Sequence, residues 1–176
     1  MISHALFGSE QDCIVAVLDG ASVPGLPQVM HEQRIEHECL YRGELKPDLV
    51  ATAPYVARCK PQHPFTEWLL TEGWGRHWGI FAAVPQGLPM RDLRKHFRTF
   101  LMVKDPQGRT LYFRYYDPRV MGVYLPSCNA SEMKTVFGPV LSYALEDEDG
   151  GALLRLRPGA IRPKVERIML AEALTT

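Results

Sequence analysis

The clearest chemical pattern in the sequence is a set of basic side chains on a predicted helix at residues 89–101. They recur at intervals of three and four residues, the spacing of neighbours on one helix face: Arg91, Arg94, Lys95 and Arg98. Such a basic face is either an ordinary solvated surface or a docking surface for something acidic. The spacing leaves both interpretations open, and on the second these four side chains are partner-binding residues.

A second candidate lies where a predicted strand meets a predicted helix, within residues 109–126. Asp117 precedes Pro118, and a carboxylate before a first-turn proline is typical of a helix N-terminus. Asp117 is then a helix cap and Arg119 a solvated side chain. Alternatively, Tyr116, Asp117 and Arg119 contact a partner, with Arg119 pairing bidentately with a carboxylate of that partner.

The third candidate is the tail, residues 158–176. It begins with arginine and proline, and we expect a short helix at residues 165–174. The apolar side chains of that helix would need a surface to rest on. Ile168 and Met169 are therefore further candidate partner-binding residues.

The motifs of metal, cofactor and catalytic sites are incomplete in this chain. In the stretch HEQRIEHEC, Ile35 and Gln33 stand where the two zinc-helix patterns need histidine. The glycine spacings of phosphate- and dinucleotide-binding loops and the nucleophile elbow do not occur. We therefore expect no metal, no cofactor and no catalytic residue. A site assembled from distant residues, such as His77, His96 and Asp117, leaves no spacing pattern and stays open.

The composition is that of one ordinary globular domain. The 20 basic and 20 acidic residues among 176 balance, so no overall field attracts nucleic acid or an anionic membrane. The four cysteines form no closely spaced pair, which argues against a zinc site. The sequence lacks a signal-peptide pattern and an apolar run of about 20 residues, the length of a membrane span. We expect a cytoplasmic protein.

The elements that must position these candidates alternate along the chain. Strands are predicted at residues 13–18, 53–59 and 80–84, and two hairpins are predicted around the turns at 105–108 and 146–151. In the first hairpin, two sets of side chains are predicted to alternate between faces: Leu111, Phe113 and Tyr115 inward, and Tyr112, Arg114 and Tyr116 outward. Helices are predicted at 29–35, 63–73 and 89–101, after Asp117, and after Asn129, where Asn129 and Glu132 stand in capping-box positions.

These elements predict a single α+β domain over residues 1–157, followed by the tail at 158–176. The sheet is expected to be mixed and largely antiparallel, with about six to eight strands and with helices packed against it. Tryptophans stand beside glycines in the stretch GWGRHWG. We expect the indole rings to pack against closely approaching backbone in the core.

A series of short motifs resembles a known family. In chain order they are Leu18-Asp19-Gly20, Leu40-Tyr41-Arg42-Gly43, Ala53-Pro54-Tyr55, Trp74-Gly75, Trp78-Gly79-Ile80-Phe81, Leu93-Arg94-Lys95-His96-Phe97, Phe113-Arg114-Tyr115-Tyr116-Asp117-Pro118-Arg119 and Phe137-Gly138-Pro139. The ordered set, from about residue 13 to about residue 156, is similar to the domain-of-unknown-function 4123 family, the adaptor chaperones of bacterial type VI secretion.

The resemblance implies a non-enzymatic function. Such an adaptor binds a cognate effector in the cytoplasm and helps to load it onto the spike protein of the secretion system. From the balanced charge we expect no membrane and no nucleic acid as partner. Many members of the family continue well beyond the shared domain, so cargo selection here is expected to use the domain itself or the short tail.

Two other functions remain open from the residues alone. Tyr112, Arg114 and Tyr116 on one strand face would suit the stacking of single-stranded nucleic acid. A small hydrolase would instead need a deep pocket that holds a histidine beside a carboxylate, whereas an adaptor is expected to present a shallow apolar groove.

Overall fold

The fold is built on a large antiparallel sheet, and the computed structural model describes residues 2–8, 12–105 and 107–170. The strands of this sheet are β1 (Asp12–Asp19), β2 (His37–Cys39), β3 (Pro54–Cys59), β4 (Gly79–Pro85), β7 (Ser142–Glu146), β8 (Ala152–Arg157) and β9 (Lys164–Met169). Their order is β2-β3-β1-β4-β7-β8-β9, and every pair is antiparallel. The predicted α+β fold with a largely antiparallel sheet is confirmed.

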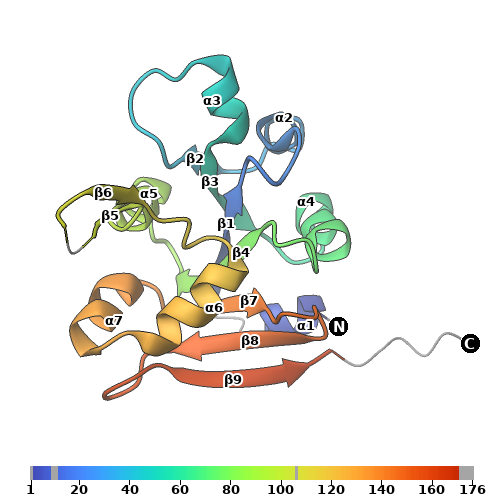
Figure 1. The fold of residues 1–176 in the computed structure, drawn as a ribbon. Coiled ribbons are helices and arrows are strands. Elements are labelled where there is room, and N and C mark those ends of the chain that lie inside the picture. The colour runs from blue at the N-terminus through green and yellow to red at the C-terminus, as the bar shows by residue number, and fades with distance from the viewer. Residues whose placement is uncertain (1, 9–11, 106, 171–176) are drawn as a thin grey trace, which may run out of the picture.

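Helices and one small hairpin complete the structure (Figure 1). The helices are α1 (Ile2–Leu6), α2 (Leu26–Glu32), α3 (Pro47–Thr52), α4 (Pro64–Trp68), α5 (Met90–Arg98), α6 (Pro118–Ser127) and α7 (Ala130–Phe137), with a π-helical turn, η1 (Leu69–Gly73), directly after α4. The hairpin pairs β5 (Met102–Lys104) with β6 (Thr110–Tyr112) and lies beside α5, outside the large sheet.

Residues 13–18 are apolar without alternation because they lie in β1, an interior strand of the sheet that is covered on both faces. Strand β1 pairs with β3 on one side and β4 on the other, so that Ala16 lies opposite Ala57 and Phe81. Successive side chains point to opposite faces of a sheet. Both faces are covered here: Val15 and Val17 belong to one buried cluster, and the residues on either side of Val15 and Val17 along the strand, Ile14, Ala16 and Leu18, belong to a second cluster.

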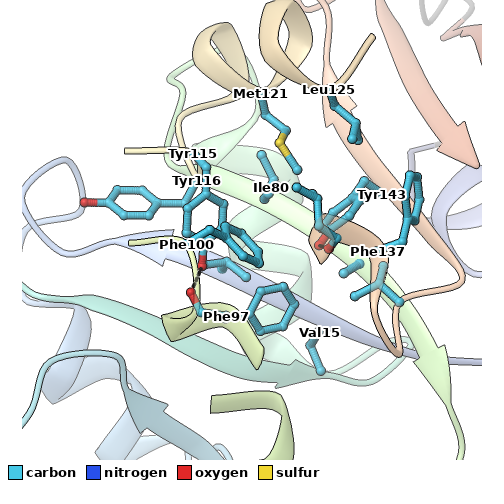
Figure 2. Close-up of a cluster of buried hydrophobic side chains, with 14 of the residues drawn as sticks. Val15, Ile80, Phe97, Phe100, Tyr115, Tyr116, Met121, Leu125, Phe137 and Tyr143 are labelled. Carbon is cyan, nitrogen blue, oxygen red and sulfur yellow. Dashed lines mark hydrogen bonds between the residues drawn. The ribbon is translucent and has the colours of Figure 1, made fainter. Parts of the chain in front are cut away.

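The first cluster lies between the sheet and the helices α5, α6 and α7. Figure 2 shows aromatic rings from α5 and α7, from the loop before α6 and from β7 gathered with the α6 side chains Met121 and Leu125. Two buried hydroxyls in this cluster donate to helix carbonyls: Tyr115 to Phe97 at 2.7 Å and Tyr143 to Val136 at 2.6 Å. A buried phenol needs such a partner, because an unpaired hydroxyl would be costly. This cluster fixes α5 and the start of α6 on the sheet.

The second cluster lies on the other face, under α1, α2, α4 and η1. The rings of Trp68 and Trp78 are 4.9 Å apart between their centres. A Cβ at Gly73 would lie only 2.6 Å from the indole carbon Cε3 of Trp78, so a larger residue does not fit there. The predicted packing of indole rings against close backbone is therefore confirmed at this pair.

Two predicted helix caps are present. The carboxylate of Asp117 accepts a hydrogen bond from the backbone N–H of Arg119 at 3.0 Å, at the start of α6. Asn129 and Glu132 form a reciprocal capping box at the start of α7. The helix α6 runs through Pro126 to Ser127 and does not stop at the proline.

The predicted strand alternation through Tyr116 is wrong. Within β6, Leu111 was predicted to point inward but is 47 % exposed, and no strand continues beyond Tyr112. Strand β6 ends at Tyr112, and the chain turns with a hydrogen bond from the backbone N–H of Asp117 to the carbonyl of Arg114 at 3.1 Å. Because the chain turns, Tyr115 and Tyr116 both enter the core, where an extended strand would have sent them to opposite faces.

The predicted helix at residues 165–174 is also wrong over residues 165–169. These residues form β9, in which Val165 lies opposite Leu156 and Ile168 opposite Leu153 of β8. The outer edge of β8 carries backbone groups that need partners, and β-branched side chains suit a strand. Residues 171–174 of the predicted helix lie outside the described residues.

Candidate partner-binding surfaces

The basic face of α5 forms as predicted, but one of its four cations binds within the chain. Arg94 Nε–H donates to the carbonyl of Cys39 at 2.7 Å, and its terminal nitrogen donates to the carbonyl of Tyr41 at 2.9 Å. Its Nε also lies 3.7 Å from the Glu38 carboxylate. Arg94 therefore fastens α5 to the segment around β2, a structural role.

Of the other three cations of α5, Arg91 and Lys95 are exposed and Arg98 is half-buried. Arg91 is exposed and lies 3.8 Å from the neighbouring carboxylate of Asp92, a weak contact between solvated groups. Among the described residues, no carboxylate forms an ion pair with Lys95 or Arg98. These two side chains keep their full charge for another molecule.

Arg98 lies at a groove that we call the hairpin groove. It runs between the end of α5, the β5–β6 hairpin and the segment after β2, and it has a volume of about 330 Å³. Its walls are Tyr41, Arg42, Arg98, Met102 and Tyr112, and its floor is Leu40 and Leu101. Like Arg98, the exposed Arg42 has no carboxylate partner in the described part of the chain.

Exposed apolar side chains gather on the hairpin beside this groove. Met102 is 52 % exposed, Leu111 47 % and Tyr112 39 %. The rings of Tyr41 and Tyr112 meet edge to face, with 5.8 Å between their centres. Burial, and then hydrogen bonding with Tyr41 and Tyr116, raises the pKa of Tyr112, so its phenol is neutral at physiological pH. The groove is thus apolar, with arginine as its only source of charge among the described lining residues.

The second candidate group is largely used inside the protein. Tyr116 is only 2 % exposed and packs in the first cluster. Arg119 does bind a carboxylate bidentately, but it is that of Asp117, with N–O distances of 3.0 and 2.7 Å. Burial alone would raise the pKa of Asp117, yet the hydrogen bonds and charge of Arg119 lower it overall. In this group only Arg119 is exposed to a partner.

Asp117 is one of four buried carboxylates that follow the same end of the sheet, and we call them the carboxylate row: Asp19, Asp117, Glu146 and Asp147. Each faces its own basic side chain, in the order Arg114, Arg119, His77 and Arg167. Asp19 ends β1, Glu146 ends β7 and Asp117 caps α6. The row therefore joins the loops at this end of the sheet to the strands.

Glu146 shows how tightly a carboxylate of the row is held. It accepts hydrogen bonds from the backbone N–H of Gly75 and, at 2.8 Å, from that of His77. His77 has a left-handed backbone conformation, with φ at 58°, which is uncommon for a residue with a side chain. Its Nδ1 lies 2.5 Å from a Glu146 oxygen, an ion pair when the imidazole is protonated, although the contact lacks hydrogen-bond geometry.

Asp19 and Asp147 are held in the same manner. Asp19 accepts from Ser22 Oγ at 2.8 Å and from the guanidinium of Arg114. Arg167 of β9 donates to Asp147 at 2.5 Å. Burial tends to raise the pKa of Asp147, and the bond from Arg167 lowers it overall. This last pair ties β9 to the turn between β7 and β8.

A pocket of about 330 Å³ beside the row holds His77 next to Glu146, the arrangement that a small hydrolase would need. Its described lining contains no serine, threonine or cysteine, and both oxygens of Glu146 accept backbone N–H groups. His96 does not join this pocket. Its Nε2 lies 3.1 Å from the Val136 carbonyl, and burial lowers its pKa to about 4. His77, His96 and Asp117 therefore do not assemble into one site.

The third candidate divides between the faces of β9. Ile168 is partly buried and packs against the second cluster. Met169 is 65 % exposed and is the member of the pair that is open to a partner. Sequence reasoning placed both on a helix, where they would have shared a surface; on a strand, neighbours point to opposite sides.

The described residues contain no group of three or more histidine, cysteine or acidic side chains arranged for a metal ion. The four cysteines are free. A search of the same residues found no helix long and apolar enough to cross a membrane.

Only Arg98 and Tyr112 of the described groove lining were candidates for binding from the sequence, so Tyr41, Arg42 and Met102 were missed. Arg42 lies on a different element from Arg98, so no spacing links them. The weak signal available was the motif Leu40-Tyr41-Arg42-Gly43, which contains three lining residues of the groove. The sequence likewise did not predict that the carboxylate row forms a group, because three of its members come from separate strands or helices.

Comparison with known proteins identifies one family. The model described as Domain of unknown function (DUF4123) matches residues 15–135, which is over two thirds of the chain. The match runs from β1 into α7 and contains the hairpin groove, whereas β7, β8 and β9 lie outside it. No curated protein and no solved structure matches the chain.

Proposed function

Because the chain belongs to the DUF4123 family, we propose that it is an adaptor of bacterial type VI secretion. In this function it binds a cognate effector in the cytoplasm and helps to load that effector onto the spike protein, without catalysing a reaction. The family as a whole is associated with such adaptors. That this chain binds an effector and contacts the spike protein is part of the proposal.

The observation that carries the proposal is the family match over residues 15–135. A second observation supports it. On a chain with no net charge, the hairpin groove combines exposed apolar side chains with two arginines that have no internal partner among the described residues. Clustered exposed apolar side chains are typical of protein-binding surfaces. The remaining proposed contact residues are Arg91, Lys95, Arg119 and Met169, each exposed on the surface.

Binding of single-stranded nucleic acid receives less support from the geometry. That function needs Tyr112, Arg114 and Tyr116 on one open face. Tyr116 is buried, and Arg114 pairs with Asp19. Only Tyr112 of the three is both exposed and without a charged partner.

The test is an affinity capture from the native bacterium at moderate salt, followed by mass spectrometry. The full chain is the bait, and a strain that lacks its gene is used for the secretion assay. We expect one toxin-like protein in the captured fraction, with or without the spike, and we expect the same protein to disappear from the medium of the deletion strain.

The control distinguishes adaptor function from general loss of secretion. The tube protein must still be secreted by the deletion strain, and in the parent strain the adaptor itself must stay in the cell. Capture of RNA alone, or unchanged secretion of every toxin in the deletion strain, would refute the proposed function.

A further inference from the structure

The hairpin groove brings together two arginines that have no carboxylate partner among the described residues. Ten ion pairs are recorded among the described residues, and they include nine arginines. Arg42 and Arg98 belong to none of them, yet both line the same apolar groove. The guanidinium group pairs well with carboxylates, because its donors match the two oxygens of a carboxylate. The groove therefore lacks an acidic partner within the described part of the chain.

The apolar side chains of the groove and of the hairpin indicate that this partner is larger than a small ligand. A small ligand that filled the groove would occupy about 330 Å³, a volume at the lower end of the range for ligand pockets, about 300–1,000 Å³. It would leave Leu111 exposed, because that side chain stands outside the groove lining on the same hairpin. A polypeptide segment covers both the groove and the hairpin. Methionine at such a surface adapts to different apolar side chains, and Met102 forms part of the wall.

We propose that the hairpin groove binds an acidic amphipathic segment of the partner protein. Apolar side chains of the segment enter between Tyr112, Met102 and the floor, and its carboxylates pair with Arg42 and Arg98. This inference rests on the proposed function in taking the partner to be the effector.

The basic surface continues from the groove along α5. Lys95 and Arg91 follow Arg98 on the same face, at spacings of three and four residues. A segment that carries several carboxylates is therefore held beyond the groove as well, by surface charges that act mainly on the rate of association and its salt dependence.

A nucleic acid fits this groove less well than a protein segment. Base stacking needs an open aromatic face, and the Tyr112 ring already contacts the Tyr41 ring edge to face. The floor consists of the aliphatic residues Leu40 and Leu101, whose side chains offer bases no hydrogen bonds.

The first experiment measures binding of the purified effector, identified by the capture above, to the full chain. The double substitution Arg42→Glu with Arg98→Glu reverses both groove charges. We expect its affinity for the effector to fall at least tenfold, and we expect the wild-type affinity to fall as sodium chloride is raised. The double substitution with lysine keeps the charge but loses bidentate pairing, so its affinity should lie between the two.

The matched control makes the same change of charge at the opposite edge of the sheet. Arg162→Glu with Lys164→Glu alters two exposed cations that also have no carboxylate partner among the described residues and that lie just before and at the start of the edge strand β9. The other edge strand is β2, which contacts α5. We expect less than a twofold change in affinity. Thermal unfolding of all variants verifies that they are folded.

The second experiment identifies the segment itself. The photoreactive residue p-benzoylphenylalanine replaces Met102 in one variant and the exposed Ile161 in a control variant, and each is irradiated in complex with the effector. We expect Met102 to be crosslinked to one segment in which aspartate or glutamate alternates with apolar residues, and we expect no crosslink to that segment at Ile161.

The outcomes separate this inference from the proposed function. Failure of the wild-type chain to bind any effector contradicts the function. A complex that forms normally with the double charge-reversal variant (Arg42→Glu with Arg98→Glu), that crosslinks through a segment without carboxylates, or that gives no crosslink at position 102 refutes the groove assignment and leaves the function standing. A salt-sensitive gel shift with single-stranded RNA that is lost in the charge-reversal variant would also refute it.

Discussion

The carboxylate row and the hairpin groove both use arginine, but in opposite ways. In the row, Arg114, Arg119 and Arg167 each face a buried carboxylate of the same chain. In the groove, Arg42 and Arg98 face apolar side chains and no carboxylate of the described residues. The sequence placed members of both regions among its candidates without distinguishing them.

The difference shows that the residues around an arginine decide whether it stabilises the fold or remains available for binding. A buried carboxylate must be paired, because an isolated charge loses its hydration. The cation beside it is therefore committed to the fold. An exposed arginine with no partner contributes little to stability and remains available for binding. Four variants test this contrast in order of decreasing effect on stability. Three are measured by the free energy of unfolding in urea and one by the pH of acid unfolding.

The largest effect is expected from Glu146→Ala in the row. This substitution removes a buried carboxylate and leaves the backbone N–H groups of Gly75 and His77 without their acceptor, and a hydrogen bond to a charged group contributes about 1.5–3 kcal/mol. We expect urea unfolding to show a loss of about 3 kcal/mol. Glu146→Gln keeps one acceptor oxygen and should lose less. A loss below about 1 kcal/mol for the alanine variant would show that Glu146 is not structural.

Arg114→Ala should have a smaller effect, since it removes the cation and leaves the carboxylate. Asp19 is 2 % exposed and keeps the donors of Ala21 and Ser22. Because the Arg114 side chain is itself half exposed, we expect a loss of roughly 1–2 kcal/mol rather than the roughly 3–5 kcal/mol of a fully buried pair. Equal stability of this variant and wild type in urea would contradict a structural role for the pair.

Arg119→Ala is expected to change the pH dependence of stability. The pKa of Asp117 is lowered in the folded protein, so its contribution is present above the unfolded pKa of about 4 and is lost as pH falls through the folded pKa. Removing the cation raises the folded pKa. The midpoint of acid unfolding, followed by circular dichroism, should therefore move to higher pH, and it should stay in place in Arg42→Ala.

The smallest effect is expected from Arg42→Ala combined with Arg98→Ala. Neither guanidinium has an ion pair to lose within the described chain, so stability should change by no more than about 0.5 kcal/mol. A loss comparable to that of Arg114→Ala in the same urea experiment would mean that the groove arginines are structural. The contrast between the two regions would then be lost.

Local patterns were sufficient for much of the fold. The helix cap at Asp117, the capping box at Asn129 and the basic face of α5 each depend on neighbours within a few residues, and each was predicted. The turn after β6 and the strand β9 were not. By sequence, Tyr115 and Tyr116 fit a strand as well as a turn. Packing in the first cluster determines that both are buried.

The sequence by itself thus determined many of the elements, the largely antiparallel α+β class and the family resemblance, because these rest on local spacing and on an ordered set of motifs. Only the tertiary structure decided which charges are committed. Arg94 and Arg98 are equivalent on a helical projection, yet one meets the carbonyls of Cys39 and Tyr41 and the other meets an apolar groove. The reason is physical: the partner of a charge is set by chain segments that are distant in sequence and close in space.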